Sequence, residues 1–241
     1  MSGYIDLHCH YLPAIDDGVR TLEDGMVLCR GLKAIGFDTV VATPHIRTAM
    51  FENRRPGLER AFEGFRDAAA AADGMPALGL GAEHFFDDVV WDLFMRGEAV
   101  PYPGGRAALV EFPSESIPAR VADRFFELQI REIRPVLAHP ERYPALFRST
   151  DPLDRLLDVG ALPLLDVMAL VGRYGRRPRR AAERMLDEGV YYAACSDSHR
   201  PGDVDVVAEA IQRLHRLVGE EEARELLAVH PRAILDGTAQ V

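Results

Sequence analysis

The sequence predicts an α/β fold, a (β/α)7 barrel of seven parallel strands that is one unit short of the common eight-unit, TIM-like barrel. Short β-rich runs alternate with longer amphipathic runs along all 241 residues, which is typical of parallel strands joined by crossover helices. No Ser/Gly-rich linker, low-complexity tract or sequence repeat interrupts this alternation. With 48% hydrophobic residues the chain can bury one large core, so we expect a single domain over residues 1–241. The pattern leaves one alternative, an open doubly wound sheet.

Seven β-rich, apolar runs supply the expected strands. The first begins at Tyr4, and the others recur at intervals that leave room for a helix between successive strands. The expected strands are residues 4–7, 39–42, 77–81, 107–112, 135–138, 162–167 and 190–194.

The amphipathic runs between these strands predict the helices. In the first of them Thr21 is a typical N-cap, and apolar residues from Leu22 to Ile35 recur at helical spacing. The expected helices are residues 22–36, 57–72, 89–97, 119–132, 153–159, 179–188, 203–219 and 221–228.

Net charge and cysteine content exclude several classes of function. The formal charge of −10 argues against nucleic acid as a partner, because phosphate backbones are bound mainly by positive patches. The N-terminus lacks a basic and apolar leader, and no apolar run approaches the roughly 20 residues that span a bilayer. The three cysteines do not suggest a disulfide framework, and none is followed six residues later by Arg, as in cysteine-dependent phosphatases. We therefore expect a cytoplasmic protein without membrane insertion.

Histidine and acidic side chains occur where the expected strands end. Because the carboxyl ends of parallel barrel strands lie on one face, where active sites are built, these groups are expected to converge. His8 and His10 are two residues apart, so in extended chain their rings point the same way and can grip one ion together. The full set at strand ends is His8, His10, His45, Glu83, Glu111, His139, Asp197 and His199.

Asp17 and the remaining histidines also fit ordinary structural roles. Asp17 joins the cluster only if the first loop folds back over the strand ends, and Asp-Asp-Gly is also an ordinary turn sequence. A histidine taken singly is usually a satisfied core or surface side chain, which is our interpretation of His84, His215 and His230. The occurrence of the five others at strand ends is better explained by a common site.

The residue types in this cluster suit divalent metal ions. Imidazole and carboxylate ligands without thiolate favour Mn, Fe or Zn, and nine candidate ligands are too many for one ion. The set fits two or three ions, with positions left for water and substrate. A water that bridges two such ions becomes hydroxide near neutral pH, while the ions offset the charge of a phosphoryl group. The cluster therefore predicts phosphoester hydrolysis.

Three arginines lie close to the candidate ligands in sequence. Arg142 follows a ligand by three residues, Arg47 by two and Arg200 by one. A guanidinium can hold phosphate oxygens in a bidentate fork, so we expect catalytic roles for Arg142 and Arg200 and substrate contact for Arg47. Phe51 and Tyr143 are candidates for the wall of a pocket that holds an aromatic ring, although ordinary core packing explains them equally well.

Six motifs carry the candidate ligands. They are Ile-Asp-Leu-His-Cys-His-Tyr-Leu-Pro-Ala-Ile-Asp-Asp-Gly from Ile5, Ala-Thr-Pro-His from Ala42, Gly-Ala-Glu from Gly81, Leu-Val-Glu-Phe-Pro from Leu109, Pro-Val-Leu-Ala-His-Pro-Glu-Arg-Tyr from Pro135, and Asp-Ser-His from Asp197. These motifs resemble those of the polymerase and histidinol phosphatase (PHP) superfamily. Within it the chain is most similar to the bacterial manganese-dependent protein tyrosine phosphatases of capsule and exopolysaccharide systems. The motifs span nearly the whole chain, and those from Ile5 and Pro135 are long enough to be specific.

The resemblance implies a distorted seven-stranded barrel (the PHP fold), manganese as the cofactor, and Asp17 as a ligand. It implies that a phosphotyrosine on the C-terminal tail of a membrane-linked bacterial tyrosine autokinase is the substrate, in polysaccharide assembly. The implied ligand sets are His8, His10, Glu83 and Asp197; Glu83, Glu111 and His139; and Asp17, His45 and His199. One stretch departs from the family, because a more polar end of the sixth strand is expected around Asp166. The role of Asp166 is left open.

The resulting hypothesis is a metal-dependent phosphotyrosine protein phosphatase. A metal-bridging hydroxide would attack phosphorus, Arg142 and Arg200 would hold the non-bridging oxygens, and a phenolate would leave. One alternative is a small-molecule phosphomonoesterase such as a histidinol phosphatase. The other is a non-catalytic regulatory module that binds the kinase tail, but such a module has no need of nine ligands. The sequence gives no indication of the oligomeric state.

Overall fold

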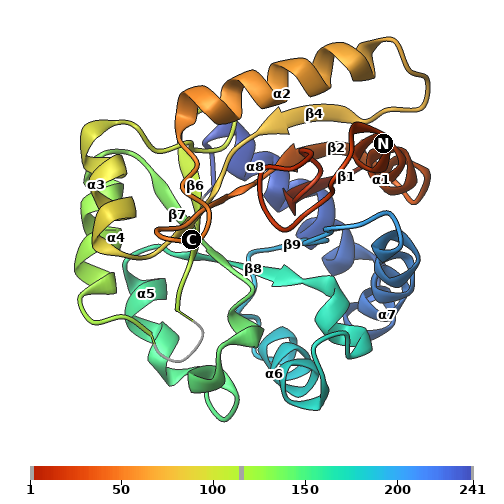
Figure 1. Ribbon diagram of the computed structural model, residues 1–241. Coiled ribbons are helices and arrows are strands. Elements are labelled where there is room, and N and C mark those ends of the chain that lie inside the picture. Colours follow the sequence, from red (N-terminus) through yellow and green to blue (C-terminus); the bar gives the residue numbers. More distant parts are fainter. Residues whose placement is uncertain (1–2, 114–116, 240–241) are drawn as a thin grey trace.

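The chain forms an α/β structure in which helices lie around the outside of the parallel strands (Figure 1). The computed structural model describes residues 3–113 and 117–239, so residues 1–2, 114–116 and 240–241 of the expected domain lie outside the described part. All pairings between the named strands are parallel, which confirms the predicted fold class. The strands are β1 (Tyr4–Cys9), β2 (Phe37–Ala42), β3 (His45–Ile46), β4 (Ala77–Leu80), β5 (Glu83–Phe85), β6 (Ala107–Glu111), β7 (Arg134–Ala138), β8 (Leu162–Asp166) and β9 (Ala193–Cys195).

The described strands form two sheets, so the predicted single barrel of seven strands is not confirmed. One sheet has the order β1-β2-β4 and the other β3-β5-β6-β7-β8-β9. The seven expected strands are all present, but β3 and β5 are additional, because the second and third expected strands are followed by short continuations. Pro44 separates β2 from β3, and it has no N–H group to donate to a ladder. Backbone hydrogen bonds from Gly81 to Ala42 (2.8 Å) and from Glu83 to Pro44 (3.1 Å) cross the interruption.

The edge strands β1 and β9 of the two sheets are linked at their carboxyl ends. The N–H of Asp197 donates to the carbonyl of His8, and the N–H of His10 donates to the carbonyl of Ser198, both at 2.9 Å. The first and last strands therefore present their following residues side by side, although the sequence separates them by almost 190 positions.

A buried carboxylate strengthens this link. Asp6 in β1 accepts hydrogen bonds from the N–H of His8 (3.2 Å) and from both the N–H (3.0 Å) and the hydroxyl (2.5 Å) of Ser196. Burial raises the pKa of Asp6 to about 6, against the lowering effect of these donors. Asp6 thus satisfies buried donors from both sides of the junction between the sheets.

The described part of the chain has eight α-helices, six between strands and two after the last strand, and none of them is both long and apolar enough to cross a membrane. Thr21 caps the first helix as predicted, accepting from the N–H of Asp24 at 3.1 Å. The helices are α1 (Leu22–Ala34), α2 (Arg55–Ala70), α3 (Asp88–Arg96), α4 (Val121–Ile130), α5 (Asp154–Asp158), α6 (Arg176–Asp187), α7 (Asp203–Arg224) and α8 (His230–Asp236). Shorter helical turns are η1 (Pro140–Arg142), η2 (Pro144–Leu146), η3 (Asp151–Leu153), η4 (Val167–Val171) and η5 (Glu225–Val229).

The largest differences from the predicted helices lie at α6, at α8 and at Gly219, and other helix boundaries differ by one or two residues. Helix α6 begins at Arg176, three residues earlier than expected. Pro178 lies in its first turn, where a backbone N–H has no helical acceptor, so the missing N–H of proline does not prevent the earlier start. Helix α8 was not expected, and its second residue is likewise a proline, Pro231. The expected break after residue 219 appears as a kink, where Gly219 adopts φ 85° inside α7.

Alternate residues of the strands are buried on opposite faces of the sheet. Leu109 packs in one apolar cluster with Val136 and Leu164, whereas its neighbour Val110 packs in the other. The first cluster contains side chains of β1, β2 and β6–β9, together with Tyr102, Ala239 and residues of α8. It fills the space between the strands, and the second cluster lies under the helices. Glu111 and Asp166 continue the first face by strand parity, so this face ends in carboxylates.

Replacing Asp6 by Ala should lower the free energy of unfolding by at least about 2 kcal/mol, because each buried donor left without an acceptor costs about 1–3 kcal/mol. Chemical denaturation of chelator-treated protein measures this change. Asp38→Ala, which removes an exposed acceptor for the N–H of Gly3, is the control and should change stability little. Equal loss in both variants would contradict the role given to Asp6.

Candidate metal centre

All nine predicted ligands lie together at the carboxyl ends of the strands. They fall into four groups, and within a group one nitrogen or oxygen atom from each residue lies within 4.8 Å of the others. The groups share members, so they form one continuous cluster. The groups are His10, Asp17, His45 and His199; His8, His10 and Asp197; His8, Glu83 and His139; and His45, Glu83 and Glu111. The binding of ions by this cluster stays a prediction.

Glu83 lies at the centre of the cluster. Its Oε2 lies 3.0 Å from Nε2 of His8 and 3.1 Å from Nδ1 of His45, and its Oε1 lies 3.1 Å from Nε2 of His139. The same Nε2 atom of His8 also lies 3.2 Å from Oδ1 of Asp197. Glu83 is almost completely buried, so one carboxylate joins imidazoles from three separate parts of the chain.

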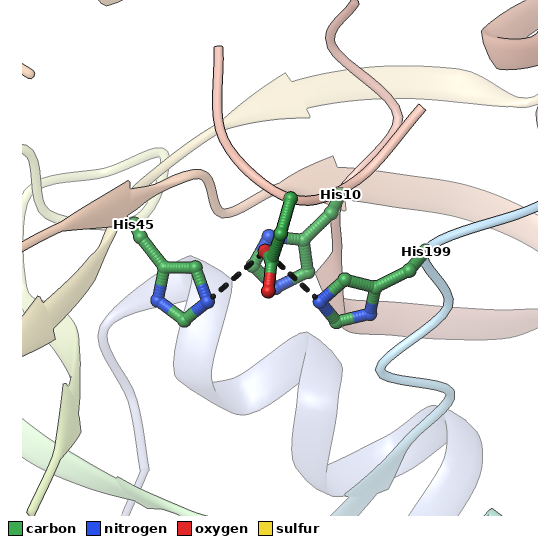
Figure 2. Close-up of side chains that lie close together, drawn as sticks. His10, His45 and His199 are labelled. Carbon is green, nitrogen blue, oxygen red and sulfur yellow. Dashed lines mark ion pairs between the residues drawn. The ribbon is translucent and has the colours of Figure 1, made fainter. Parts of the chain in front are cut away.

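Asp17 reaches the cluster because the loop between β1 and α1 folds back over the strand ends. Figure 2 shows His10, His45 and His199 close together, and its dashed lines mark the ion pairs that His45 and His199 form with Asp17. Oδ1 of Asp17 lies 3.5 Å from Nε2 of both His45 and His199. The condition that the sequence left open for Asp17 is therefore met by the loop geometry.

The observed groups differ from the implied ligand sets. Asp17, His45 and His199 share one group with His10, whereas Glu83 lies near His8 and His10 but outside the group that joins them to Asp197. The remaining set is divided, because Glu111 and His139 each lie near Glu83 but share no group among the described residues.

Burial and imidazole charges set the protonation of the carboxylates. Burial alone would raise the pKa of Glu83 and of Asp197, but the neighbouring imidazoles, His8 foremost, hold both pKa values well below the usual range. Burial and the charge of Glu83 raise the pKa of Glu111 to about 8. Two central acids are thus ionised at neutral pH, as metal ligands must be.

The imidazoles divide into two kinds. Burial lowers the pKa of His45, and burial together with the charge of Arg142 lowers that of His139 to about 4, so both rings are neutral near pH 7. At His8 and His10 burial acts in the same direction, but nearby carboxylates outweigh it and raise both pKa values. A ligating imidazole must be neutral, so binding of a cation here is coupled to release of protons.

Asp16, which the sequence analysis did not single out, orients one of the ligands. Its Oδ2 lies 2.7 Å from Nδ1 of His10 and accepts from the N–H of His45 at 3.1 Å, while its Oδ1 accepts from the N–H of Gly18 at 3.0 Å. A carboxylate on the second ring nitrogen fixes the tautomer and direction of a ligating histidine. The only sequence signal for Asp16 is its place in the Asp-Asp-Gly motif, which does not indicate that it lies beside His10.

Two of the predicted ligands adopt a left-handed backbone. His139 has φ 34° and Asp197 has φ 47°, each just beyond the strand that carries it. Such conformations cost about 1–3 kcal/mol for residues other than glycine, and they persist where surrounding structure enforces them. Both residues turn their side chains into the cluster at the point where the chain leaves the sheet.

Arg142 is positioned beside the cluster by two acids and an aromatic ring. Its Nη1 lies 2.5 Å from Oδ2 of Asp197 and 3.7 Å from Oδ2 of Asp166, and its guanidinium lies 4.6 Å from the ring centre of Tyr174. Asp166 is fully buried, and burial with the charge of Asp197 raises its pKa to about 7. The departure at the sixth strand end thus places an acid next to Arg142.

The other predicted contact residues occupy different environments. Arg200 is exposed, Arg47 stacks on the ring of Phe85 at 4.2 Å, and Phe51 stacks on His45 with ring centres 5.3 Å apart. Tyr143 is buried, and its hydroxyl donates to the carbonyl of Ala138 and accepts from a backbone N–H. The side chain of Tyr143 therefore has almost no exposed surface with which to contact a substrate. Its hydrogen bond to Ala138 instead supports the backbone before His139.

Side chains interpreted as structural have structural partners. His84 is buried between the carbonyl of Leu109 and the N–H of Val100, and His215 and His230 contact Tyr4 and the backbone of Tyr192. All three cysteines are buried, and burial raises the pKa of each thiol.

The donor atoms of the cluster fit divalent cations. Three buried atoms that face the cluster have no hydrogen-bond partner among the described residues, namely Nδ1 of His45, Oε2 of Glu111 and Oδ1 of Asp197. Buried polar atoms are nearly always paired, and a bound cation would supply the missing partner for such atoms. Nitrogen and oxygen donors without thiolate suit borderline or hard divalent ions.

The chain is similar to known proteins over most of its length. A family profile for capsular polysaccharide synthesis, CpsB/CapC, matches residues 4–236. The tyrosine-protein phosphatase YwqE of Bacillus subtilis is 28% identical over 196 residues, which are 81% of this chain and 77% of that protein. The tyrosine-protein phosphatase CpsB of Streptococcus pneumoniae is 25% identical over 240 residues, 96% of this chain and 98% of that protein. A solved structure, described as YwqE from Bacillus subtilis and CpsB from Streptococcus pneumoniae, metal-dependent tyrosine phosphatases, has a TM-score of 0.90 at 24% identity, covering 98% of this chain and 96% of that one.

Asp16→Asn should weaken manganese binding about 10- to 100-fold, because loss of the carboxylate partner of a ligating histidine has effects of this size. Competition with a chromophoric chelator measures the affinity without any assay of turnover. Asp67→Asn, at an exposed acid on α2, is the control and should bind as the wild type does. Unchanged affinity in Asp16→Asn would show that His10 does not depend on Asp16.

Proposed function

This chain belongs to the capsular polysaccharide synthesis CpsB/CapC family, and we propose that it is a metal-dependent phosphatase that hydrolyses phosphotyrosine in proteins. The observation that carries the proposal is the cluster of nine imidazole and carboxylate ligands beside Arg142. The relatives that match over most of their length are tyrosine-protein phosphatases, which supports the choice of substrate.

The proposed cofactor is two or three divalent ions, manganese in the first place and iron or zinc otherwise. Four overlapping groups of ligands are more than one ion can use, and Glu83 belongs to two of them. When bound, such ions would supply Lewis-acid stabilisation of a phosphoryl group and lower the pKa of a coordinated water. The proposed ligands are the nine residues of the cluster.

The side chains around the cluster would bind and orient the phosphoester. Arg142, with Arg200, would hold the non-bridging oxygens, Asp166 and Tyr174 would keep the guanidinium of Arg142 in place, and Arg47 and Phe51 would contact the substrate near His45. A water oxygen would attack phosphorus as the bond from phosphorus to the tyrosine oxygen breaks. The leaving group is a phenolate, whose pKa of about 10 makes a dedicated general acid unnecessary.

The remaining parts of the proposal concern the setting of the enzyme. We propose one cytoplasmic PHP-type domain over residues 1–241, and a phosphotyrosine on the tail of a bacterial tyrosine kinase of polysaccharide assembly as substrate. We also propose that the two sheets are one distorted, seven-stranded barrel. Support comes from the backbone hydrogen bonds that join β1 to β9 and that continue across the interruption at Pro44.

The test of the proposed function compares substrates after metal removal and restoration. Chelation should abolish turnover of a phosphotyrosine peptide, manganese should restore it, and His10→Ala or Asp197→Ala should lower kcat at least about a hundredfold, the scale of losing one electrostatic stabiliser of a transition state. A larger kcat/KM for histidinol phosphate than for the peptide would favour the small-molecule phosphatase. Binding of the peptide without turnover of any phosphoester would favour the regulatory module.

Arg142→Lys should raise the inhibition constant of inorganic phosphate about tenfold, because lysine keeps the charge but loses the fork, and one charged hydrogen bond contributes about 1.5 kcal/mol. Arg124→Lys, whose guanidinium pairs with Asp88 on the helical side of the structure, is the matched control. The metal content of both variants should equal that of the wild type. An unchanged inhibition constant would mean that Arg142 does not contact phosphate.

A further inference from the structure

A basic cleft opens on the surface between the turn η2 and the helix α6. It has a volume of about 440 Å³ and is lined by Pro144, Ala145, Phe147, Arg148, Arg177 and Arg180. Arg184 fixes the two walls together, because its guanidinium donates to the carbonyls of Leu146 and Phe147. The shape of the cleft is therefore set by the fold rather than by flexible side chains alone.

The arginines of the basic cleft lack counter-charges. Arg148, Arg177 and Arg180 are exposed, and none of their side chains has an ion pair or a hydrogen bond within residues 3–113 and 117–239. Neighbouring Arg176 is in the same state, whereas Arg179 pairs with Glu183. The chain as a whole has a net charge of −10. Its overall composition therefore does not explain why unpaired arginines gather at this cleft.

The position of these charges is unfavourable for the helix that carries them. Helix α6 begins with Arg-Arg-Pro-Arg-Arg, has no acidic residue in its first turn, and has no side-chain cap at Gly175. Cations near a helix N-terminus oppose the helix dipole, and acidic residues are preferred there. A local arrangement that costs stability without structural compensation is most often found where function requires it.

Both walls of the basic cleft continue directly from the elements that hold Arg142. Pro144 follows Arg142 by two residues, and Arg177 follows Tyr174, which stacks on Arg142, by three. Chain segments of this length span at most about 7 and 10 Å. Figure 1 shows α6 at the same end of the molecule as β8 and the segment after β7. The cleft therefore adjoins the two chain segments that carry Arg142 and its stacking partner Tyr174.

We propose that the basic cleft binds acidic residues that flank the phosphotyrosine of a protein substrate. This inference rests on the proposed function and adds a determinant of its specificity. Arg148, Arg177 and Arg180 would pair with Asp or Glu side chains two to four positions from the phosphotyrosine, while the apolar surfaces of Pro144 and Phe147 pack on the peptide. Small phosphoesters do not extend to the cleft and gain nothing from it.

The test uses two phosphotyrosine peptides that differ only in having Asp and Glu, or Asn and Gln, at the flanking positions. The manganese-loaded wild type should prefer the acidic peptide about tenfold in kcat/KM, through KM, as expected for several exposed ion pairs acting together. The triple variant Arg148→Gln, Arg177→Gln, Arg180→Gln should lose this preference while its kcat, and its activity on p-nitrophenyl phosphate, stay unchanged. Raising the salt concentration should reduce the preference of the wild type in the same way.

The matched control carries the same change of charge at Arg60, Arg131 and Arg216, which are exposed on α2, at the end of α4 and on α7. It should keep the preference. The proposal would be overturned if the wild type had the same kcat/KM for both peptides. It would also be overturned if the cleft variant lost kcat/KM equally for both peptides. A cleft variant that loses only binding to vesicles containing phosphatidylserine would likewise overturn it, because the cleft would then recognise a lipid surface.

The failure of the proposed function gives a different pattern. In that case neither the peptides nor p-nitrophenyl phosphate is hydrolysed with manganese, yet fluorescence anisotropy with the labelled peptides still measures the cleft. Tighter binding of the acidic peptide by the wild type and by the control, but not by the cleft variant, would support the cleft even without turnover. Equal binding of both peptides by all three proteins would reject it.

Discussion

The structure depends on the compensation of charge among ionisable groups that are buried at one end of the strands. Carboxylates of Glu83 and Asp197 are withdrawn from water, where each would be very costly alone. They are tolerated because imidazoles and the Arg142 guanidinium lie within hydrogen-bonding distance. At the carboxyl ends of the strands, protons and cations thus compete for the same imidazole and carboxylate atoms. The surrounding packing has to hold those atoms in place. The left-handed backbone of His139 and Asp197 is part of what this arrangement costs.

Much of this arrangement could be predicted from the sequence, for a physical reason. Parallel strands place their carboxyl ends on one face. The position of a polar residue just after an apolar run can therefore be predicted even when its spatial neighbours are unknown. His45, Glu83 and His139 were placed in this way, and each lies in the cluster. Asp17 required the path of a loop, which local sequence does not determine. The family resemblance supplied what the pattern left open.

The features that were missed depend on contacts between distant segments. Asp16 and Asp17 are adjacent and chemically identical, and only the fold decides which of them orients the ring of His10 and which pairs with the rings of His45 and His199. The interruption at Pro44 divides the strands between two sheets. Counting apolar runs in the sequence does not predict this division. The start of α6 at Arg176 was missed because basic residues and a proline are unusual at a helix N-terminus, and that local conflict coincides with the basic cleft.

The burial of Cys9, Cys29 and Cys195 has a consequence for how the protein responds to its chemical surroundings. Thiols react with peroxides and alkylating agents as thiolates, and burial disfavours the thiolate at all three positions. Enzymes that remove phosphate from tyrosine through an activated cysteine are switched off when that sulfur is oxidised. Here no sulfur takes part in the proposed chemistry. Oxidation of thiols, which inactivates the cysteine-dependent phosphatases, is therefore expected to leave this reaction active.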